Sequence, residues 1–263
     1  MSDAAASDDF CFRKWWRWLI RPETRRLLSL KSPLALSPAS LIPNMDMTTP
    51  PSSEASDAPS VLYHNVPLEI KTSTRLLTLH CGSGKDPIVC SLTTVDLEMN
   101  PQYEALSYFW GSPNETASVL LDSAPVNVRE NLWLALWHLR FVNRYRILWI
   151  DALCINQQNV RERNHQVGLM DRIYSKAAEV LVWLGPASGN SDKAMDCLAD
   201  FIQVGNDFIS SRRIDKGPEH REAVADLCKR EYWRRMWILQ VRPRGSVCLL
   251  LLGECLRLRE GSN

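Results

Sequence analysis

The spacing of apolar residues changes along the chain, and each change predicts a different kind of structure. From Val61 onward, short apolar runs alternate with turn residues, a pattern typical of β-strands. The predicted strands cover 68–70, 76–79, 88–92, 105–109, 119–121 and 126–128. The last two flank Asp122-Ser-Ala-Pro125, which predicts a hairpin turn. The region 61–128 is therefore predicted to be a β-meander.

Helical spacing follows after residue 128. Leu132, Leu136 and Leu139 predict an amphipathic helix over roughly 129–142. Continuous apolar runs at 147–150 and 180–184 predict strands buried on both faces. Between these runs, a helix is predicted over 159–177, and Asn159-x-x-Glu162 at its start resembles a capping box. Further helices are expected at about 191–210 and 220–232.

The order strand, helix, strand from 147 to 184 predicts a βαβ unit. Its two strands should run parallel and be joined by a right-handed crossover. The fold class is therefore α/β: an N-terminal β-meander leads into a layered mixed sheet with flanking helices.

The first 60 residues differ from the rest in composition. Residues 31–60 are rich in proline and serine, which predicts a disordered linker. The segment 10–21 alternates aromatic and basic residues at helical spacing, as an interfacial membrane helix or a partner-binding helix would. An accidental pattern in a disordered tail is favoured over both, because the stretch covers few helical turns. The predicted organisation is a disordered leader at 1–60, a folded domain at 61–253 and a tail at 254–263.

Composition narrows the class of protein. The 263 residues carry a net charge of +1, which argues against a dedicated nucleic-acid-binding protein. The eight cysteines show no C-x-x-C pair, so no zinc site is predicted, and no cofactor is expected. No secretory signal is visible and the longest apolar run, Val247–Leu252, is too short to span a bilayer. A cytoplasmic protein whose partners are other proteins is expected.

Four features invite a catalytic interpretation. Gly82-Ser-Gly84-Lys85 lacks the other residues of a phosphate-binding loop, so a simple turn is predicted. Cys154 and His165 match no nucleophile signature. Asp151 ends an apolar strand, where ligands often bind, but with Asn156 it would also serve to fix the loop that follows. The fourth feature is a set of tryptophans at strand ends, interpreted as core rather than as an aromatic pocket: Trp110, Trp149 and Trp183.

Two longer motifs resemble a known family. The block from Tyr103 to Gly111, YEALSYFWG, resembles the opening motif of the fungal heterokaryon incompatibility (HET) domain. The block from Leu148 to Gln157, LWIDALCINQ, resembles its central motif. Further matches follow in the order that the family has, at Glu162-Arg163, Gln166-Val167, Met170, Ile173-Tyr174 and 182–185. The resemblance covers roughly 63–240.

The resemblance implies a function. HET proteins take part in fungal nonself recognition, and the domain triggers programmed cell death when incompatible hyphae fuse. The domain has been likened to TIR domains of innate immunity, which signal by assembling and in some cases hydrolyse NAD. By that likeness, Ser107, Trp110, Asp151 and Asn156 would lie at the functional face. The other motif residues expected there are Tyr103, Gly111, Cys154, Gln157, Arg163, Gln166, Tyr174, Trp183, Arg235, Trp237 and Gln240.

One departure from the family pattern bears on chemistry. HET proteins usually carry Arg-x-Trp-x-x-Gln-Glu, whereas here Gln240 is followed by Val241. In the TIR comparison that Glu would be the catalytic carboxylate, so its replacement argues against NAD hydrolysis. Weak alternative carboxylates are Asp151, Glu104 and Glu162.

Three hypotheses remain after the sequence is read. The favoured one is a death-signalling domain that acts through protein association. The alternatives are a TIR-like NAD-cleaving enzyme and a degenerate, inactive copy. Family members usually continue beyond the point where this chain ends, so a C-terminally truncated domain is expected.

Overall fold

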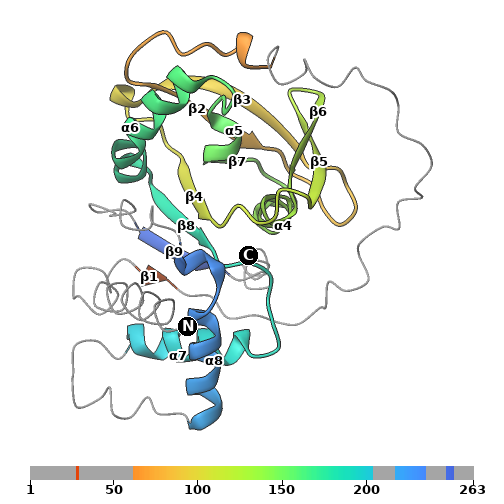
Figure 1. Cartoon of the computed structure of the whole chain (residues 1–263), viewed down its shortest axis with the longest axis vertical. Helices are drawn as coiled ribbons and strands as arrows, with labels where there is room; N and C mark the ends of the chain where they lie inside the picture. The colour runs from red at the N-terminus through yellow and green to blue at the C-terminus, as the bar shows by residue number, and fades with distance from the viewer. Residues whose placement is uncertain (1–27, 30–61, 204–216, 235–246, 252–263) are drawn as a thin grey trace, which may run out of the picture. The chain divides into compact units, whose positions relative to one another are not determined.

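The computed structural model describes residues 28–29, 62–203, 217–234 and 247–251 (Figure 1). Most of the predicted leader, including the basic segment 10–21, lies outside the described residues, as does the tail 254–263. The same holds for Arg235, Trp237, Gln240 and Val241. Where the structure describes the chain, no helix is both long and apolar enough to cross a membrane.

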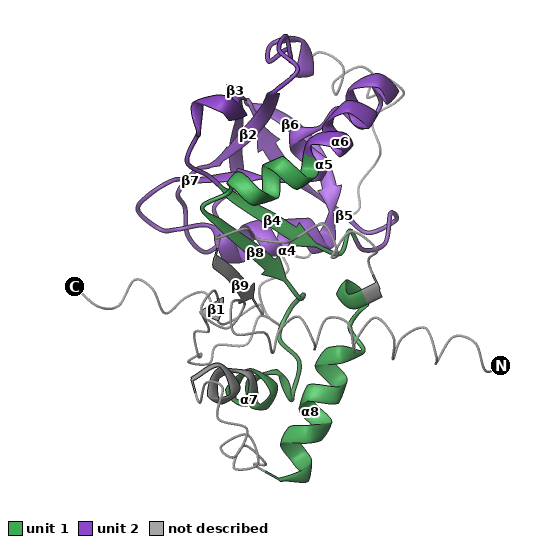
Figure 2. Ribbon diagram, turned by 90° about the vertical axis from the view of Figure 1, so that its left-hand side faces the viewer, with its two compact units in different colours: residues 1–34, 104–110, 170–263 green, residues 35–103, 111–169 purple. Residues whose placement is uncertain are grey.

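The chain divides into two compact units, coloured separately in Figure 2. The described part of unit 1 comprises 28–29, 104–110, 170–203, 217–234 and 247–251. That of unit 2 comprises 62–103 and 111–169.

Unit 2 contains five strands in the order β7-β2-β3-β5-β6. Their bounds are Ser73–Leu79 for β2, Val89–Asp96 for β3, Thr116–Leu121 for β5, Ala124–Arg129 for β6 and Arg146–Trp149 for β7. The pair β3/β5 is parallel and the other pairs are antiparallel, so the sheet is mixed. The short helix η2, Leu97–Met99, follows β3, and α4, Glu130–Leu139, follows β6. The helices α5, Asp151–Cys154, and α6, Val160–Lys176, come after β7, and α6 ends in unit 1.

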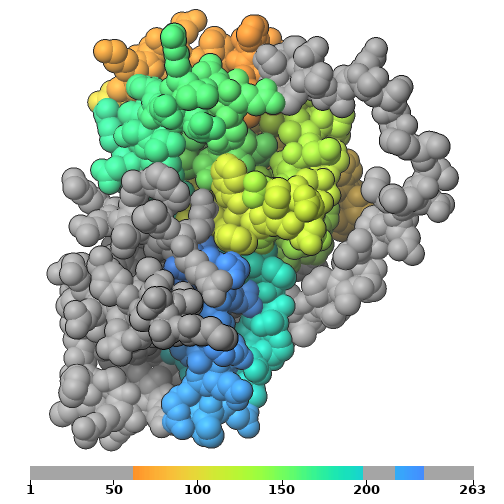
Figure 3. Space-filling model, in the orientation of Figure 1, coloured from red at the N-terminus to blue at the C-terminus, as the bar shows by residue number. Residues whose placement is uncertain are grey.

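Local sequence explains the hairpin and the helix of unit 2. Asp122 and Ser123 join β5 to β6 with φ values of 48° and 70°, the backbone of a two-residue type I′ turn. The hairpin prediction is therefore confirmed. In α4, the three leucines of the predicted apolar face are buried, as expected for a helix with one side on the core. In the space-filling view, the segment after residue 62 meets α6 on the surface of unit 2 (Figure 3).

The described residues of unit 1 form four strands in the order β1-β9-β8-β4, all parallel. They are Leu28–Ser29 for β1, Glu104–Tyr108 for β4, Glu179–Trp183 for β8 and Val247–Leu251 for β9. Residues 180–183 of β8 are almost fully buried, which explains their uninterrupted apolar sequence. The helices are α7, Ser191–Gln203, α8, Pro218–Cys228, and the short η4, Glu231–Arg234.

The mixed α/β fold class is confirmed, with one correction of detail. The predicted strand at 68–70 is wrong: the backbone N–H of Ser73 donates to the Ile70 carbonyl at 2.9 Å, which makes a turn before β2. Pro67 lacks an N–H for strand pairing and Ile70 is 56% exposed, so neither residue supports a strand there. The strand predicted at 147–150 forms β7 and pairs with β2, antiparallel, and the strand predicted at 180–184 forms β8 and pairs with β4 and β9, parallel to both.

Candidate functional site

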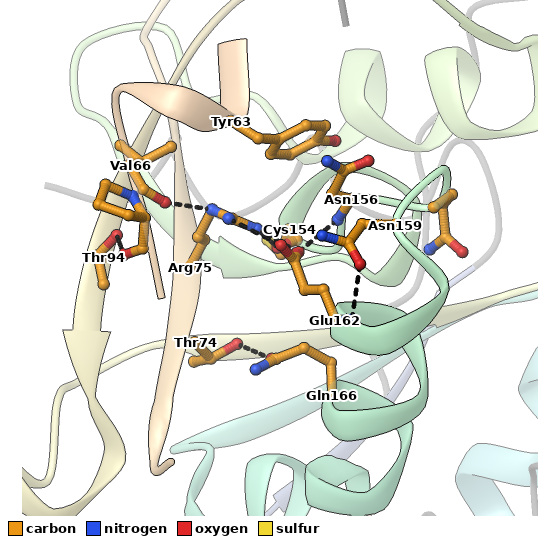
Figure 4. Close-up of polar contacts among 12 residues, drawn as sticks. Tyr63, Val66, Thr74, Arg75, Thr94, Cys154, Asn156, Asn159, Glu162 and Gln166 are labelled. Atoms are coloured by element: carbon orange, nitrogen blue, oxygen red, sulfur yellow. Dashed lines mark hydrogen bonds and ion pairs between the residues drawn. The ribbon is translucent and has the colours of Figure 1, made fainter. Parts of the chain in front are cut away.

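A buried arginine on β2 lies beside the central motif (Figure 4). Arg75 is 1% exposed, and its Nη1 and Nη2 atoms donate to Glu162 Oε1 and Oε2 at 2.6 and 3.2 Å. The Nε atom donates to the Val66 carbonyl at 2.6 Å, and Nη1 also reaches the Cys154 carbonyl at 3.2 Å. The guanidinium therefore joins the start of unit 2, the loop of the central motif and helix α6. We call Arg75, Glu162 and their partners the Arg75 centre.

Glu162 connects this arginine to the loop that follows α5. Its Oε1 atom also accepts the backbone N–H of Asn156 at 2.7 Å. The capping-box prediction is only half right. The Asn159 side chain caps α6 by accepting the N–H groups of Arg161 and Glu162, both at 3.1 Å. The Glu162 carboxylate, however, turns to Arg75 and Asn156, because a buried guanidinium offers a stronger, charge-assisted partner than the N-cap amide.

Tyr63 covers the Arg75 centre from the segment that precedes β2 (Figure 4). Its ring centroid lies 4.8 Å from Arg75 Cζ, a cation–π contact, and its hydroxyl donates to the Leu153 carbonyl at 3.1 Å. Burial raises the pKa of Tyr63 to about 12, so the phenol is neutral at physiological pH. The centre thus pairs its one cation with Glu162 and covers it with an aromatic ring.

A second, uncharged network joins α6 to β2 and β7. Thr74 Oγ1 donates to Gln166 Oε1 at 2.8 Å and accepts the indole N–H of Trp149 at 3.0 Å. Gln166 Nε2 donates to the Ser73 carbonyl at 2.8 Å. Glu162 and Gln166 are four residues apart and so lie on one face of α6, facing β2. Trp149 is fully buried, which confirms the core interpretation for this tryptophan.

The central-motif residues fix the loop after β7. Asp151 follows β7, begins α5 and is buried, and its carbonyl accepts Gln157 Nε2 at 2.7 Å. The Gln157 carbonyl in turn accepts Arg163 Nη1 at 3.2 Å. Asn156 Oδ1 accepts the N–H of Gln158 at 3.2 Å. These bonds make the loop compact by local side-chain to backbone pairing.

The cysteine of the central motif is not an activated nucleophile. Cys154 is fully buried, and desolvation raises the pKa of its thiol to about 12. Its sulfur accepts the backbone N–H of Ile150 at 3.3 Å. A nucleophilic cysteine needs a lowered pKa and access to substrate. His165 is exposed, and its Nε2 lies 2.7 Å from the Lys71 carbonyl.

The opening-motif residues divide between the units. In unit 1, Ser107 on β4 shares a 2.9 Å hydrogen bond with the Tyr232 hydroxyl, and Tyr174 donates to the Leu106 carbonyl at 3.2 Å. Trp183 is fully buried and Trp110 half-buried. Glu104 begins β4, where it pairs in register with Glu179 on β8.

Tyr103 and Gly111, at the two ends of the opening motif, belong to unit 2. Tyr103 is 2% exposed, and this burial raises the pKa of its phenol. Gly111 has φ +80°, and a Cβ atom there would lie 3.2 Å from Asn131 Cβ, so backbone conformation and space both favour glycine. Its carbonyl accepts Arg129 Nη1 at 2.8 Å.

The glycine-rich turn at 82–85 is held by a second buried arginine. Arg140 donates to the carbonyls of Gly84, Asp86 and Pro87 at 3.4, 2.9 and 3.0 Å. The Gly84 carbonyl also accepts Trp137 Nε1 at 3.0 Å. A phosphate-binding loop points its N–H groups inward, whereas here these carbonyls point to a cation. The prediction of a turn rather than a phosphate-binding loop is consistent with this geometry.

The segment Arg75–Leu79 also fits the family pattern, but sequence reasoning assigned no role to the upstream residues that hold the central motif: Tyr63, Thr74 and Arg75. One signal was present: Arg75 directly precedes Leu76 and Leu77 in the predicted strand, and an arginine that is buried with such a strand requires a charged or polar partner. It also missed Tyr232, the partner of Ser107. Of the weak catalytic candidates, Glu162 is bound to Arg75, and Asp151 lies in the same loop region of unit 2.

The chemistry of the Arg75 centre is that of a rigid internal support. Its carboxylate is neutralised by a guanidinium, and its thiol and phenol have raised pKa values. Among the residues that the structure describes, no group of three or more His, Cys, Asp or Glu side chains is arranged to hold a metal ion. The centre therefore orders the loop between β7 and α6.

Comparison with known proteins agrees with the motifs. Residues 103–240 match the family model described as heterokaryon incompatibility protein (HET). The chain is 36% identical over 182 residues to heterokaryon incompatibility protein 6, OR allele, of Neurospora crassa. That match covers 64% of this chain but only 26% of the longer relative. No solved structure matches the chain significantly. Because the family model covers more than half of its length and includes both motifs, the chain belongs to the heterokaryon incompatibility family.

Proposed function

We propose that this protein acts in fungal nonself recognition and triggers programmed cell death by associating with other protein chains in the cytoplasm. Family membership supports a role in heterokaryon incompatibility. The further elements, cell death, cytoplasmic location and protein association, are our proposal for this chain.

The hydrogen bonds of the Glu162 carboxylate favour protein association over catalysis. This carboxylate receives two hydrogen bonds from Arg75 and a third from the Asn156 backbone. A carboxylate that must stabilise positive charge in a substrate cannot at the same time neutralise a buried arginine. The motif residues around it contact one another, so their role is to hold the shape of the domain and of the surface that partners meet.

The direct test is inducible expression of the full chain in a filamentous fungus. The expected result is arrest of growth and uptake of a membrane-impermeant dye after induction. A fluorescent fusion that retains killing should be distributed through the cytoplasm. Unaffected growth at protein levels confirmed by immunoblot would contradict the proposal and favour a degenerate copy.

Measuring NAD in the same cultures separates the two active alternatives. If death depends on association, NAD should hold steady until membranes fail. An early fall in NAD, together with NAD cleavage by the purified chain, would replace our proposal with the enzymatic one. Two matched variants alter neighbouring residues on α6. Glu162→Gln changes the residue that is bonded to Arg75, and Arg161→Gln, next to it, is the control.

A further inference from the structure

Unit 2 exposes five large apolar side chains among its described residues: Val160, at the start of α6, and two pairs near the two ends of the β2/β3 strands. Ile70 and Met99 are 56% and 80% exposed, and Val142 and Tyr145 are 56% and 64% exposed. Methionine, tyrosine and arginine are enriched where proteins meet, but single exposed apolar residues are ordinary, so the charges around the two pairs carry the argument. The two pairs differ in the charges around them.

The first pair lies where β2 begins and β3 ends. The N–H of Leu97 donates to the Thr72 carbonyl at 3.1 Å, which joins the segment before β2 to η2. Ile70 and Met99 each follow an exposed glutamate, Glu69 and Glu98. We call these four residues the acidic end. Asp96 and Lys71 are its charged neighbours, so carboxylates outnumber the single ammonium three to one.

The second pair lies at the opposite end of the same strands. The N–H of Gly82, in the turn between β2 and β3, donates to the Phe141 carbonyl at 3.0 Å, which joins this turn to the loop after α4. Val142 and Tyr145 share that loop with the exposed Arg144, and Lys85 is exposed on the turn. We call Lys85, Val142, Arg144 and Tyr145 the basic end.

Aromatic and backbone contacts hold the loop and the turn of the basic end, and its exposed charges are mainly positive. Arg144 Cζ lies 3.9 Å above the Phe141 ring, and Arg146 Cζ lies 4.9 Å from the same ring. Beneath them, Arg140 binds the turn through three backbone carbonyls. Asp86 is the nearby acid, and its carboxylate accepts the Ser83 N–H at 2.9 Å. The two exposed cations, Lys85 and Arg144, therefore outnumber this one carboxylate, whereas Arg140 and Arg146 are buried.

From these two surfaces we infer that copies of this chain associate head to tail, the acidic end of one copy on the basic end of the next. The two ends are carried by opposite termini of the β2/β3 pair, in which Ser73 is opposite Asp96 and Leu79 is opposite Cys90 (Figure 1). A seven-residue strand separates them by roughly 20 Å. A single copy therefore cannot join its own two ends, but two copies can.

This geometry has a defined consequence. A surface that binds a different surface on an identical copy forms a heterologous contact, which extends into rings or filaments. Complementary charge steers the encounter and disfavours the pairing of two like ends. The inference rests on the proposed function, since it names the surface through which association would occur.

Charge reversal of the full chain tests it, with self-association measured by sedimentation at low ionic strength. The basic-end variant is Lys85→Glu with Arg144→Glu, and the acidic-end variant is Glu69→Lys with Glu98→Lys. Each should weaken self-association by about tenfold or more. Reversals at exposed positions outside both ends, Glu115→Lys and Arg161→Glu, should leave it unchanged. Removing the apolar part alone, with Val142→Ser and Tyr145→Ser, should also weaken it.

Mixing the two reversed variants is the decisive measurement. Each retains one native end, so an equimolar mixture should associate although neither variant does so alone. A symmetric interface between like ends predicts the opposite, since the variant reversed at the unused end would still self-associate. The inference is overturned if the wild-type chain stays monomeric, if either reversal leaves association intact, or if the mixture stays monomeric.

Failure of this inference can be told apart from failure of the proposed function. If the wild-type chain kills cells but does not self-associate, killing uses another protein partner and only the head-to-tail inference fails. If it associates through these ends while cells grow normally, the surface is real and the proposed function fails.

Discussion

Two buried arginines organise two loops of unit 2, and they do so by different means. Arg75 meets a carboxylate, so the loop between β7 and α6 depends on a full ion pair. Arg140 meets three backbone carbonyls at the turn between β2 and β3. Burial lowers the pKa of Arg140, an effect that the neighbouring Asp86 offsets in part. Substituting the arginine should therefore change the unfolding free energy differently in the two loops, because one depends on an ion pair and the other on hydrogen bonds to neutral carbonyls.

The difference follows from the groups that lose their partner when each arginine is removed. Removing Arg75 leaves Glu162, 14% exposed, as a largely buried charge without its counter-ion. Removing Arg140 leaves neutral carbonyls in a turn that is mostly exposed, where water can replace the lost bonds. We therefore expect the Arg75 centre to be more sensitive than the 82–87 turn.

The largest expected effect is that of Arg75→Met. Breaking a buried ion pair by removing one partner costs about 3–5 kcal/mol of unfolding free energy. Urea unfolding followed by tryptophan fluorescence measures the loss. Arg161→Met is the matched control, because Arg161 is exposed on the same helix as Glu162. Equal losses for the two variants would contradict the role of the Arg75 centre.

Removing the carboxylate as well should recover stability. In Arg75→Met combined with Glu162→Leu, no charge is left buried, so we expect the double variant to lose about 1–3 kcal/mol less than Arg75→Met alone. The Asn156 N–H loses its acceptor in this variant, which limits the recovery. The double-mutant cycle in urea gives the coupling energy. Strict additivity of the two single losses would show that the pair is not coupled.

Arg140→Met should have a smaller effect. Its carbonyl partners lie in an exposed turn, so a loss of about 1–2 kcal/mol is expected. The loss is measured by thermal unfolding of Arg140→Met. The control is Lys85→Met, which changes an exposed residue of the same turn. A loss as large as that of Arg75→Met would mean that dipoles and charge hold these loops equally well.

The smallest expected effect is that of Tyr63→Phe. The ring keeps its position over Arg75, and only the bond to the Leu153 carbonyl is lost, a change of about 1 kcal/mol. Burial raises the pKa of Tyr63 from 10.0 to about 12, so this contribution is complete below pH 10 and is lost as pH rises toward 12. Stability measured across that range should fall less steeply in Tyr63→Phe than in the wild type. Identical pH profiles would show that folding does not change the pKa of this phenol, which would contradict the effect of burial.

Much of the fold could be predicted because its signals are local. The hairpin at 122–123, the apolar face of α4 and the buried strand at 180–183 each depend on neighbouring residues, and each was found in the sequence. The false strand at 68–70 arose because a three-residue apolar pattern cannot be told from a turn. Ile70 is exposed there, and its carbonyl accepts the Ser73 N–H.

The roles of the site residues could not be predicted in the same way. Asn159-x-x-Glu162 indicated a capping box, and half of that motif formed. The other half was replaced by Arg75, which lies 87 residues away in sequence. A pattern of neighbouring residues cannot reveal a contact between residues so far apart, and the match to the family model begins at residue 103, downstream of Arg75 and Tyr63.

By itself, the sequence determined the family, the fold class and the order of most helices and strands, because motifs and apolar periodicity are properties of short segments. Tertiary structure alone decided that the central motif is supported from upstream by Arg75, and that one β-strand pair carries an acidic end and a basic end. Both depend on residues that are distant along the chain and become neighbours only when the sheet and its loops form. Burial then determines which charges must be paired inside and which remain on the surface to meet a partner.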